Sequence, residues 1–267
     1  MTHGYVWAVV LGLTGAVFVR SAGAQDMMRN VDLSSPDMTS AEMTRAQVEA
    51  AVAAAAPSRP ADFTGKRLSG LDLSGLDLSG AVFRAARLNK TNLAHARLDR
   101  AVLDQAWLLD ADLRGASLTD ASLFATQMRR ANLDGADLSG ARVVADLTGA
   151  SLIGATLASA RMGADMKNQS MGLMRAVLTS AKLDRANLRG ADLSRANIEF
   201  ASLKEADLTD ASLNGAALAG ADFTAAMIAG ADFSGADLTS ARLVAPVGLD
   251  AAKNLDKAQN LDRAIRN

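Results

Sequence analysis

The feature that most constrains this chain is a five-residue repeat that runs from Ala61 to Ala245. A period of five matches neither the helical period of 3.6 residues nor the strand period of 2. An apolar residue at every fifth position therefore forms no single face on a straight helix or on a flat strand. It stays on one face only if the chain turns a corner once per unit, so that each unit is one short side of a coil.

Each unit is centred on an apolar residue, usually leucine, and we number the other positions from this central residue. Position −2 is nearly always alanine, positions −1 and +1 are polar, and about two-thirds of the glycines fall at position +2. Ala131–Gly135 and Ala136–Gly140 are two complete units. We expect central residues such as Leu133 to point inward, polar residues such as Asp134 to face water and be dispensable, and position +2 to be a turn with positive φ.

This pattern resembles that of the pentapeptide-repeat family, and the resemblance covers roughly two-thirds of the chain. The resemblance implies an all-β solenoid, a right-handed four-sided parallel β-helix in which four pentads make one coil. With about 4.8 Å between neighbouring ladder residues, nine or so coils would form a rod on the order of 40 Å long. Stability in such a rod comes from the packing of each coil on the next.

Residues 1–24 have the form of a signal peptide. Val6–Val19 is an apolar stretch of about fourteen residues, which suits a signal-peptide core and is short for a membrane span. Ala22–Ala24 has the small residues of a cleavage site. We therefore expect export to the periplasm or the outside of a bacterial cell, with no integral membrane segment after cleavage. A mis-assigned start or an uncleaved anchor is the alternative, because no Lys or Arg precedes the apolar stretch.

Residues 25–60 are expected to form a spacer and a capping helix. Asp26–Asp37 has the composition of a flexible spacer. Ser40–Ala56 is rich in alanine, Thr39–Glu42 has the form of a capping box, and Pro57 stops the helix. Such a helix would cover the unpaired backbone at the end of the first coil. A partner-binding helix is the alternative.

The repeat domain, residues 61–245, contains two irregularities. The register slips by one residue between Val143 and Leu147, and Gly163–Arg175 contains no clean pentad. The second irregularity is either an eroded coil with a small bulge or a loop that carries a contact, since loops on rigid scaffolds often carry function. Its candidate contact residues are Lys167, Asn168 and Gln169.

Residues 246–267 are expected to form a C-terminal cap. Here the period changes to six, as in Gly248–Lys253 and Asn254–Gln259, with leucine and alanine alternating every three residues. This spacing suits tight helical turns or irregular coils. A dimer contact through the C-terminal end is the alternative.

The residue inventory favours a protein that is not an enzyme. The chain has no cysteine, and His95 is the only histidine after the leader. Aspartate at position −1 follows from the repeat, so carboxylate ladders need no acid–base or metal role. The sequence has no Ser/His/Asp set, HExxH motif or phosphate loop. We therefore expect no catalytic residue, no cofactor and no metal site.

Two apolar residues at outward positions, Trp107 and Phe124, are further candidate contacts and are expected near one corner on adjacent coils. They favour a protein-binding or structural module whose partner is unknown. A net charge of −1 with alternating signs opposes nucleic-acid binding. The alternative comes from a resemblance to the quinolone-resistance pentapeptide proteins, which mimic DNA and bind DNA gyrase. Basic residues such as Arg84 and Arg87, together with the expected export, oppose this alternative.

Overall fold

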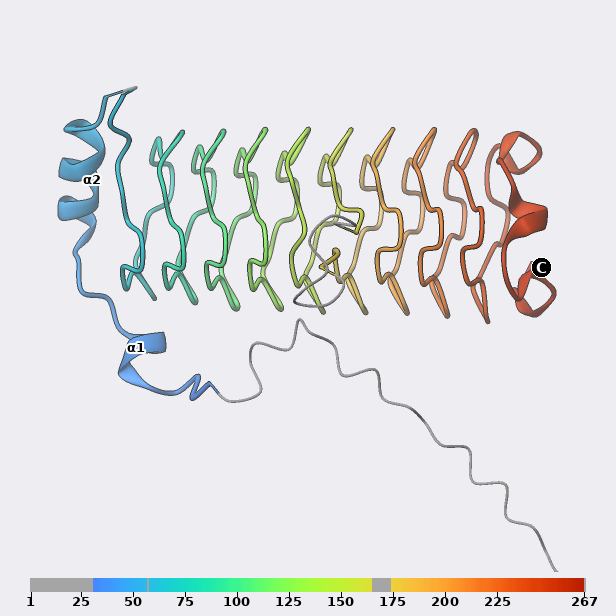
Figure 1. The fold of residues 1–267 in the computed structure, drawn as a ribbon, viewed down its shortest axis with the longest axis horizontal. Helices are drawn as coiled ribbons and strands as arrows, with labels where there is room; N and C mark the ends of the chain where they lie inside the picture. Colours follow the sequence, from blue (N-terminus) through green and yellow to red (C-terminus); the bar gives the residue numbers. More distant parts are fainter. Residues whose placement is uncertain (1–30, 57, 165–173, 267) are drawn as a thin grey trace, which may run out of the picture.

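The computed structural model describes residues 31–56, 58–164 and 174–266, in which a long rod of stacked coils has helices at its two ends (Figure 1). These elements are the α-helices α1 (Pro36–Thr39) and α2 (Arg45–Ala53) and the 3₁₀ helices η1 (Leu249–Ala251), η2 (Leu255–Lys257) and η3 (Leu261–Arg263). None of the helices among these residues has the length and apolar character needed to cross a bilayer. The predicted signal peptide, residues 1–24, lies outside the described residues.

A regular coil is twenty residues long, because parallel bridges join residues twenty positions apart, as between Asp62 and Val82. The bridged residues occupy position −1, directly before each inward residue. Four columns of bridges run along the rod and define its sides, beginning at Asp62 (side 1), Arg67 (side 2), Asp72 (side 3) and Asp77 (side 4). Each side contributes one bridged residue per coil, so the described residues form parallel bridges without continuous strands. This is the four-sided arrangement that the family resemblance implies.

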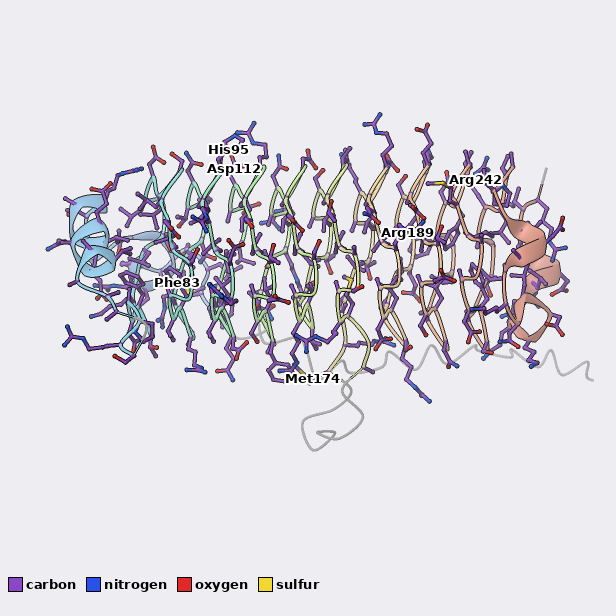
Figure 2. All side chains as sticks on the ribbon, turned by 90° about the horizontal axis from the view of Figure 1, so that it is seen from above. Phe83, His95, Asp112, Met174, Arg189 and Arg242 are labelled. Atoms are coloured by element: carbon purple, nitrogen blue, oxygen red, sulfur yellow. The ribbon has the colours of Figure 1, made fainter. Side chains whose placement is uncertain are left out.

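The core is one continuous cluster of apolar side chains along the axis of the rod, with inward residues from all four sides. Leu133 and the other central residues are almost completely buried, and so are nearly all the alanines at position −2. Near the N-terminal end, the rings of Phe63 and Phe83 stack with their centroids 5.0 Å apart. Polar side chains project outward along the whole rod (Figure 2). The predicted inward direction of the central residues is therefore confirmed, and each coil packs mainly on its two neighbours.

Position +2 adopts a positive φ whether or not it is glycine. The φ angle is +68° at Gly75, +53° at Ala85 and +59° at His95. The predicted turn at this position is confirmed. A residue with a Cβ costs about 1–2 kcal/mol in this conformation, which explains why glycine is frequent here.

The segment before α2 differs from the predicted spacer. Part of Asp26–Asp37 belongs to α1, which buries Met38 against the rod. The amide nitrogen Nδ2 of Asn89, in the second coil, donates to the carbonyl oxygen of Met38 at 3.0 Å. The prediction of a flexible spacer up to Asp37 is therefore wrong, because this long-range contact holds the segment on side 2.

Helix α2 begins later than predicted, and its capping box is formed by Thr44 and Gln47. The predicted box at Thr39–Glu42 is wrong, because Glu42 makes other contacts. Its backbone N–H donates to the carbonyl oxygen of Arg67 at 2.9 Å, which ties this stretch to the first coil in an extended conformation.

The six-residue repeat at the C-terminal end adds one more coil with longer corners. Its bridges join Asp232 to Lys253 and Asp237 to Gln259, so the spacing grows beyond twenty residues. The helices η1, η2 and η3 occupy the corners, as the predicted tight turns, and the amide of Asn254 donates to Asp232 at 2.9 Å. The capping role of this coil and the dimer contact stay predictions.

Candidate functional site

On the regular sides, acidic residues hold the coil corners and neighbouring coils together. At position −1, Asp72 accepts the N–H of Ser74 at 3.0 Å, and hydrogen bonds from the side chain and the backbone of Ser74 lower the pKa of Asp72. At position +1, Asp134 accepts the hydroxyl of Ser151 at 2.5 Å and the N–H of Ile153 at 2.9 Å in the next coil. The expectation that Asp134 only faces water is therefore wrong. Regular carboxylates have structural roles, so a functional surface has to be sought where the repeat is broken.

Trp107 is the first departure from the repeat on side 2. Its bridge partners are Arg87 in the preceding coil and Gln127 in the following one. The indole is half-buried, so this apolar residue at an outward position is partly covered. Gln127 is only 2% exposed, and its Oε1 has no hydrogen-bond partner within the described part of the chain.

Phe124 lies at the corner that joins side 1 to side 2. The backbone N–H of Gln105 donates to the carbonyl oxygen of Phe124 at 2.8 Å, and Gln105 precedes Trp107 by two residues. The two aromatic residues therefore lie near the same corner on adjacent coils, as predicted. The guanidinium of Arg142 lies 4.1 Å from the centre of the Phe124 ring, which is the geometry of a cation–π contact.

The one-residue slip in the register lies at this same corner, one coil further along. Gln127 is bridged to Asp146, nineteen residues away instead of twenty, because the corner after Val143 is one residue short. Asp146 is 4% exposed and its carboxylate pairs with the guanidinium of Arg129 at 2.6 Å. Removing one partner from a buried ion pair is strongly destabilising, so these two residues fix the local structure of side 2.

The irregular stretch Gly163–Arg175 is an insertion at this corner and not an eroded coil. Met162 is the inward residue of side 1, and Val177 continues the column of side 2 from Asp146. The N–H of Ala176 donates to the carbonyl oxygen of Met162 at 3.1 Å, which is the bond that closes nearly all regular corners. The prediction of an eroded coil is wrong, because the ladders on both sides of the insertion are complete. The candidate contacts Lys167, Asn168 and Gln169 lie outside the described residues.

The base of the insertion is fixed to the following coil. The N–H of Ala164 donates to the carbonyl oxygen of Ser194 at 2.9 Å, and the guanidinium of Arg175 donates to the carbonyl oxygen of Arg195 at 3.1 Å. A Cβ atom at Gly163 would lie 2.7 Å from the carboxylate of Asp192, so the chain passes close to this neighbour. The residues at both ends of the insertion are therefore fixed to the rod.

We call the surface formed by these departures the irregular corner. It consists of Trp107, Phe124, Gly163 and Arg175 on successive coils where side 1 meets side 2, together with the shortened turn at Val144, whose own side chain is buried. The structure thus brings two of the sequence-predicted contact residues, Trp107 and Phe124, to the edge that also carries the base of the insertion.

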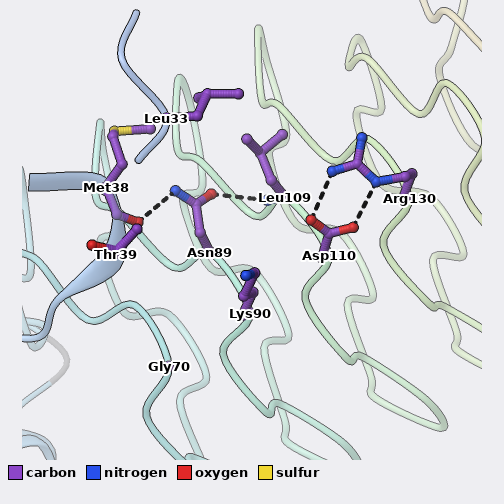
Figure 3. A pocket seen from close by; sticks show the side chains of 9 residues that line it. All are labelled: Leu33, Met38, Thr39, Gly70, Asn89, Lys90, Leu109, Asp110 and Arg130. Carbon is purple, nitrogen blue, oxygen red and sulfur yellow. Dashed lines mark hydrogen bonds and ion pairs between the residues drawn. The ribbon is translucent and has the colours of Figure 1, made fainter. Parts of the chain in front are cut away.

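The N-terminal segment covers the beginning of side 2 (Figure 3). Asn89 bridges two chain segments, because it donates to the carbonyl oxygen of Met38 and accepts the N–H of Leu109 at 3.0 Å. Beside this bridge is a hollow of about 310 Å³ whose rim includes the bidentate ion pair between Arg130 and Asp110. Sequence reasoning missed Asn89 and Leu109. Leucine at position +1 was the available signal, since that position is otherwise mostly polar.

His95 lies beside Asp112 on the outside of the rod (Figure 2). The guanidinium of Arg114 donates to both carboxylate oxygens of Asp112, at 2.9 and 2.6 Å, and this hydrogen bonding lowers the pKa of Asp112. A carboxylate held in this way is a weak base. No group of three or more His, Asp or Glu side chains with metal-binding geometry occurs in residues 31–56, 58–164 and 174–266.

Comparison with protein families gives a match to the model described as "Pentapeptide repeats", with eight copies between residues 67 and 143 and between residues 173 and 243. The match identifies the solenoid as a right-handed β-helix. The chain has no match among curated proteins.

Several solved structures are similar to this chain. HetL from the cyanobacterium Nostoc sp. strain PCC 7120, a pentapeptide repeat protein involved in heterocyst differentiation regulation, is 28% identical, with a TM-score of 0.48 over 84% of this chain and 95% of HetL. QnrB1, a plasmid-mediated fluoroquinolone resistance protein, is 14% identical, with a TM-score of 0.42 over 75% of this chain and 91% of QnrB1. A pentapeptide repeat protein from the Arabidopsis thaliana thylakoid lumen is 27% identical, with a TM-score of 0.18 over 49% of this chain and 63% of that protein.

Proposed function

Because the chain belongs to the pentapeptide-repeat family, we propose that it is a non-catalytic scaffold that binds another protein through the irregular corner. One observation carries the proposal. The departures from the repeat at Trp107 and Phe124, the shortened turn at Val144 and the insertion after Ala164 all meet at one of the four corners. Single outward apolar residues also occur elsewhere, as at Leu109, Phe200 and Met227, but the aromatic pair, the shortened turn and the insertion share this one corner.

The regular sides are poor surfaces for specific recognition. Many of their exposed charges pair with opposite charges nearby, as Arg97 does with Asp77 at 3.1 Å and Arg189 with Asp207 at 3.2 Å. Such exposed pairs contribute little energy, and they leave no long stretch of one sign. A DNA mimic needs a strongly acidic face, so this pairing opposes the gyrase-binding alternative.

The irregular corner has side chains that are typical of protein-binding surfaces. Trp107 and Phe124 are large aromatic residues, which are enriched among the residues that contribute most to protein–protein binding. They lie beside cationic side chains, because Arg142 packs on the ring of Phe124 and Arg87 precedes Trp107 in its column. A rigid rod also holds such groups at fixed separations, which reduces the entropy cost of binding.

The proposal includes export, which rests on the sequence alone. An apolar stretch followed by Ala22–Ala24 is typical of a cleaved leader. The scaffold would then act in the periplasm or outside the cell. Fractionation and N-terminal sequencing of the native protein test this part, and an intact Met1 in the cytosolic fraction contradicts it.

A pull-down from an extracytoplasmic extract tests the binding role. The bait proteins are the wild type, a variant lacking Asp165–Arg175, Trp107→Ala, and the matched control Asn197→Ala, which changes the same column of side 2 where the repeat is regular. We expect a specific partner to be lost from the first two variants and retained by the control. Retention of every specific partner by all variants contradicts the proposal, and capture of gyrase from a cytoplasmic extract supports the DNA-mimic alternative.

A further inference from the structure

The backbone of a regular coil pairs with the coil before it through three groups on each side. On side 4 of the second coil, the N–H of Arg97 donates to Leu76 at 2.9 Å, and its carbonyl oxygen accepts the N–H of Leu78 at 2.7 Å. The carbonyl oxygen of Asp99 accepts the N–H of Gly80 at 2.8 Å. The first coil has no coil before it, so the equivalent groups need other partners.

On side 2 the N-terminal segment supplies partners for two of these three groups, the N–H and the carbonyl oxygen of Arg67. The N–H of Glu42 donates to the carbonyl oxygen of Arg67 at 2.9 Å, and the N–H of Arg67 donates to Oε1 of Glu42 at 3.3 Å. Ala41 forms an antiparallel bridge with Leu68. An extended segment of this chain therefore already docks on the edge of the first coil.

On side 3 a single guanidinium replaces the missing coil. The Nη1 atom of Arg45 donates to the carbonyl oxygen of Asp72 at 3.1 Å, and Nη2 donates to that of Ser74 at 3.2 Å. In the second coil, the matching oxygens of Asn92 and Ala94 accept backbone N–H groups. Arg45 thus satisfies the two acceptors that a preceding coil would otherwise satisfy.

On side 4 the equivalent groups are the N–H and carbonyl oxygen of Asp77 and the carbonyl oxygen of Ser79. None of the three has a hydrogen-bond partner within the described residues. The equivalent groups of side 1, at Asp62 and Thr64, are also without a partner in this part of the chain, but the Asp77–Ser79 edge in addition borders a hollow of about 630 Å³ between the first coil and the end of α2. Its outer wall is apolar and includes Val52, Ala55 and Pro60.

We propose that this open edge at Asp77–Ser79 is a docking site for one extended peptide segment of a partner protein. The segment runs parallel to side 4, because the parallel register uses all three backbone groups, as it does in every following coil. Addition of a strand to an exposed edge is a common mode of peptide recognition, in which the backbone gives affinity and the pockets select side chains.

The geometry favours a single segment over a second copy of the rod. Val48 of α2 is completely buried, so the helix packs over the end of the first coil. A second rod stacked end to end would have to displace α2 together with the contacts of Arg45 and Glu42. An extended segment needs only the part of the edge that α2 leaves open.

The lining of the hollow selects the peptide side chains. Ala55 and Ala56 leave space for small apolar groups, and the only acid there, Asp77, already pairs with Arg97 at 3.1 Å. Arg100 also lines the hollow, so we expect a segment of small apolar residues in which any charged side chain is acidic. This site lies at the end of the rod and is separate from the irregular corner, so either assignment can fail without the other.

A peptide library displayed on phage tests the site, with the full chain as the target. Enriched twelve-residue peptides are synthesised, labelled and measured by fluorescence anisotropy against four proteins: the wild type, Ala55→Trp, Ala53→Trp and Trp107→Ala. Ala55→Trp fills the hollow, whereas the control Ala53→Trp places the same side chain on α2 outside the lining. Thermal unfolding establishes that both variants are folded.

We expect the enriched peptides to bind the wild type and Ala53→Trp equally, and Ala55→Trp at least tenfold more weakly. Methylation of their central backbone nitrogens should abolish binding, and Trp107→Ala should not change it. Equal binding to Ala55→Trp, or the absence of any enriched peptide that distinguishes the two variants, overturns the proposal. Self-association in sedimentation experiments that Ala55→Trp removes also overturns it, in favour of a second copy as the occupant.

Discussion

The backbone N–H of Ala176 donates to the carbonyl oxygen of Met162 at 3.1 Å, although fourteen residues separate them in the chain. In a regular corner the same bond joins residues only three apart, as between Ala181 and Leu178. The insertion therefore occupies the place of a two-residue turn, and the coils before and after it stack as if it were missing. A rod of this kind can carry a long loop without a gap in its ladders.

Removal of Asp165–Arg175 should leave the stability of the rod nearly unchanged. The deletion joins Ala164 to Ala176 and restores a regular pentad, so we expect a change of about 0.5 kcal/mol or less in the free energy of unfolding. Urea denaturation followed by far-UV circular dichroism measures it. As a control, removal of Ala206–Ala217, which is one residue longer, leaves a step of only three residues from Leu203 to Leu218 and should destabilise the rod strongly. Equal damage by the two deletions would show that the irregular stretch is part of the coil.

Substitutions of the neighbours Leu133 and Asp134 should lower the free energy of unfolding by different amounts and for different reasons. Leu133→Ala leaves a cavity in the core and should cost about 2–5 kcal/mol. Asp134→Ala leaves the hydroxyl of Ser151 and the N–H of Ile153 without their acceptor and should cost about 1–2 kcal/mol. The control Lys182→Ala, at an exposed position on side 3, should stay within about 0.5 kcal/mol of the wild type. Chemical denaturation gives the ranking, and a neutral Asp134→Ala would remove the role assigned to its carboxylate.

At position +2, replacing glycine by alanine should destabilise the rod, and replacing alanine by glycine should stabilise it. Gly75→Ala meets no atom within 4 Å, so its net cost of about 0.5–1 kcal/mol comes from the backbone at a φ of +68°, partly offset by the lower entropy of alanine in the unfolded chain. Ala85→Gly, at a φ of +53°, should stabilise by about 0.5 kcal/mol. Thermal unfolding of the two single variants tests this, and shifts of the same sign would contradict it.

Acid should lower the free energy of unfolding, because the corner aspartates become protonated. Hydrogen bonds from the side chain and the backbone of Ser74 lower the pKa of Asp72, and those of Ser79 lower the pKa of Asp77. Because the folded pKa values lie below the unfolded value, the carboxylates stabilise the fold above about pH 4. That stabilisation is lost as the pH falls through the folded pKa values. Urea denaturation between pH 7 and pH 2.5 measures the effect, and Asp72→Asn should reduce the slope at low pH.

The repeat was sufficient to predict the inward residues and the turn at position +2, because these depend on neighbours within one pentad, whereas the four sides of the coil were expected from the resemblance to the pentapeptide-repeat family. The contacts of Asn89 with Met38 and of Arg45 with Asp72 were not predicted. They join residues far apart in the sequence, where no periodicity links them. The capping box failed for the same reason, since the local pattern at Glu42 competes with a partner in the first coil.

The candidate site was predicted in part. Trp107 and Phe124 stood out because apolar residues occupied outward positions, and the coil length placed them at one corner. The same count could have placed the insertion there as well, had it been recognised as an addition between two complete pentads. An eroded coil, as predicted from the sequence, would not have been assigned to this corner.

Photocross-linking in the producing cell tests the binding role of the irregular corner most directly. Benzoylphenylalanine is introduced at Phe124 and, as a control, at Asn214, which occupies the same position of the same corner where the repeat is regular. The account predicts a discrete cross-linked product from Phe124 and none from Asn214. Equal products at the two positions, or a product only at Asn214, would contradict it.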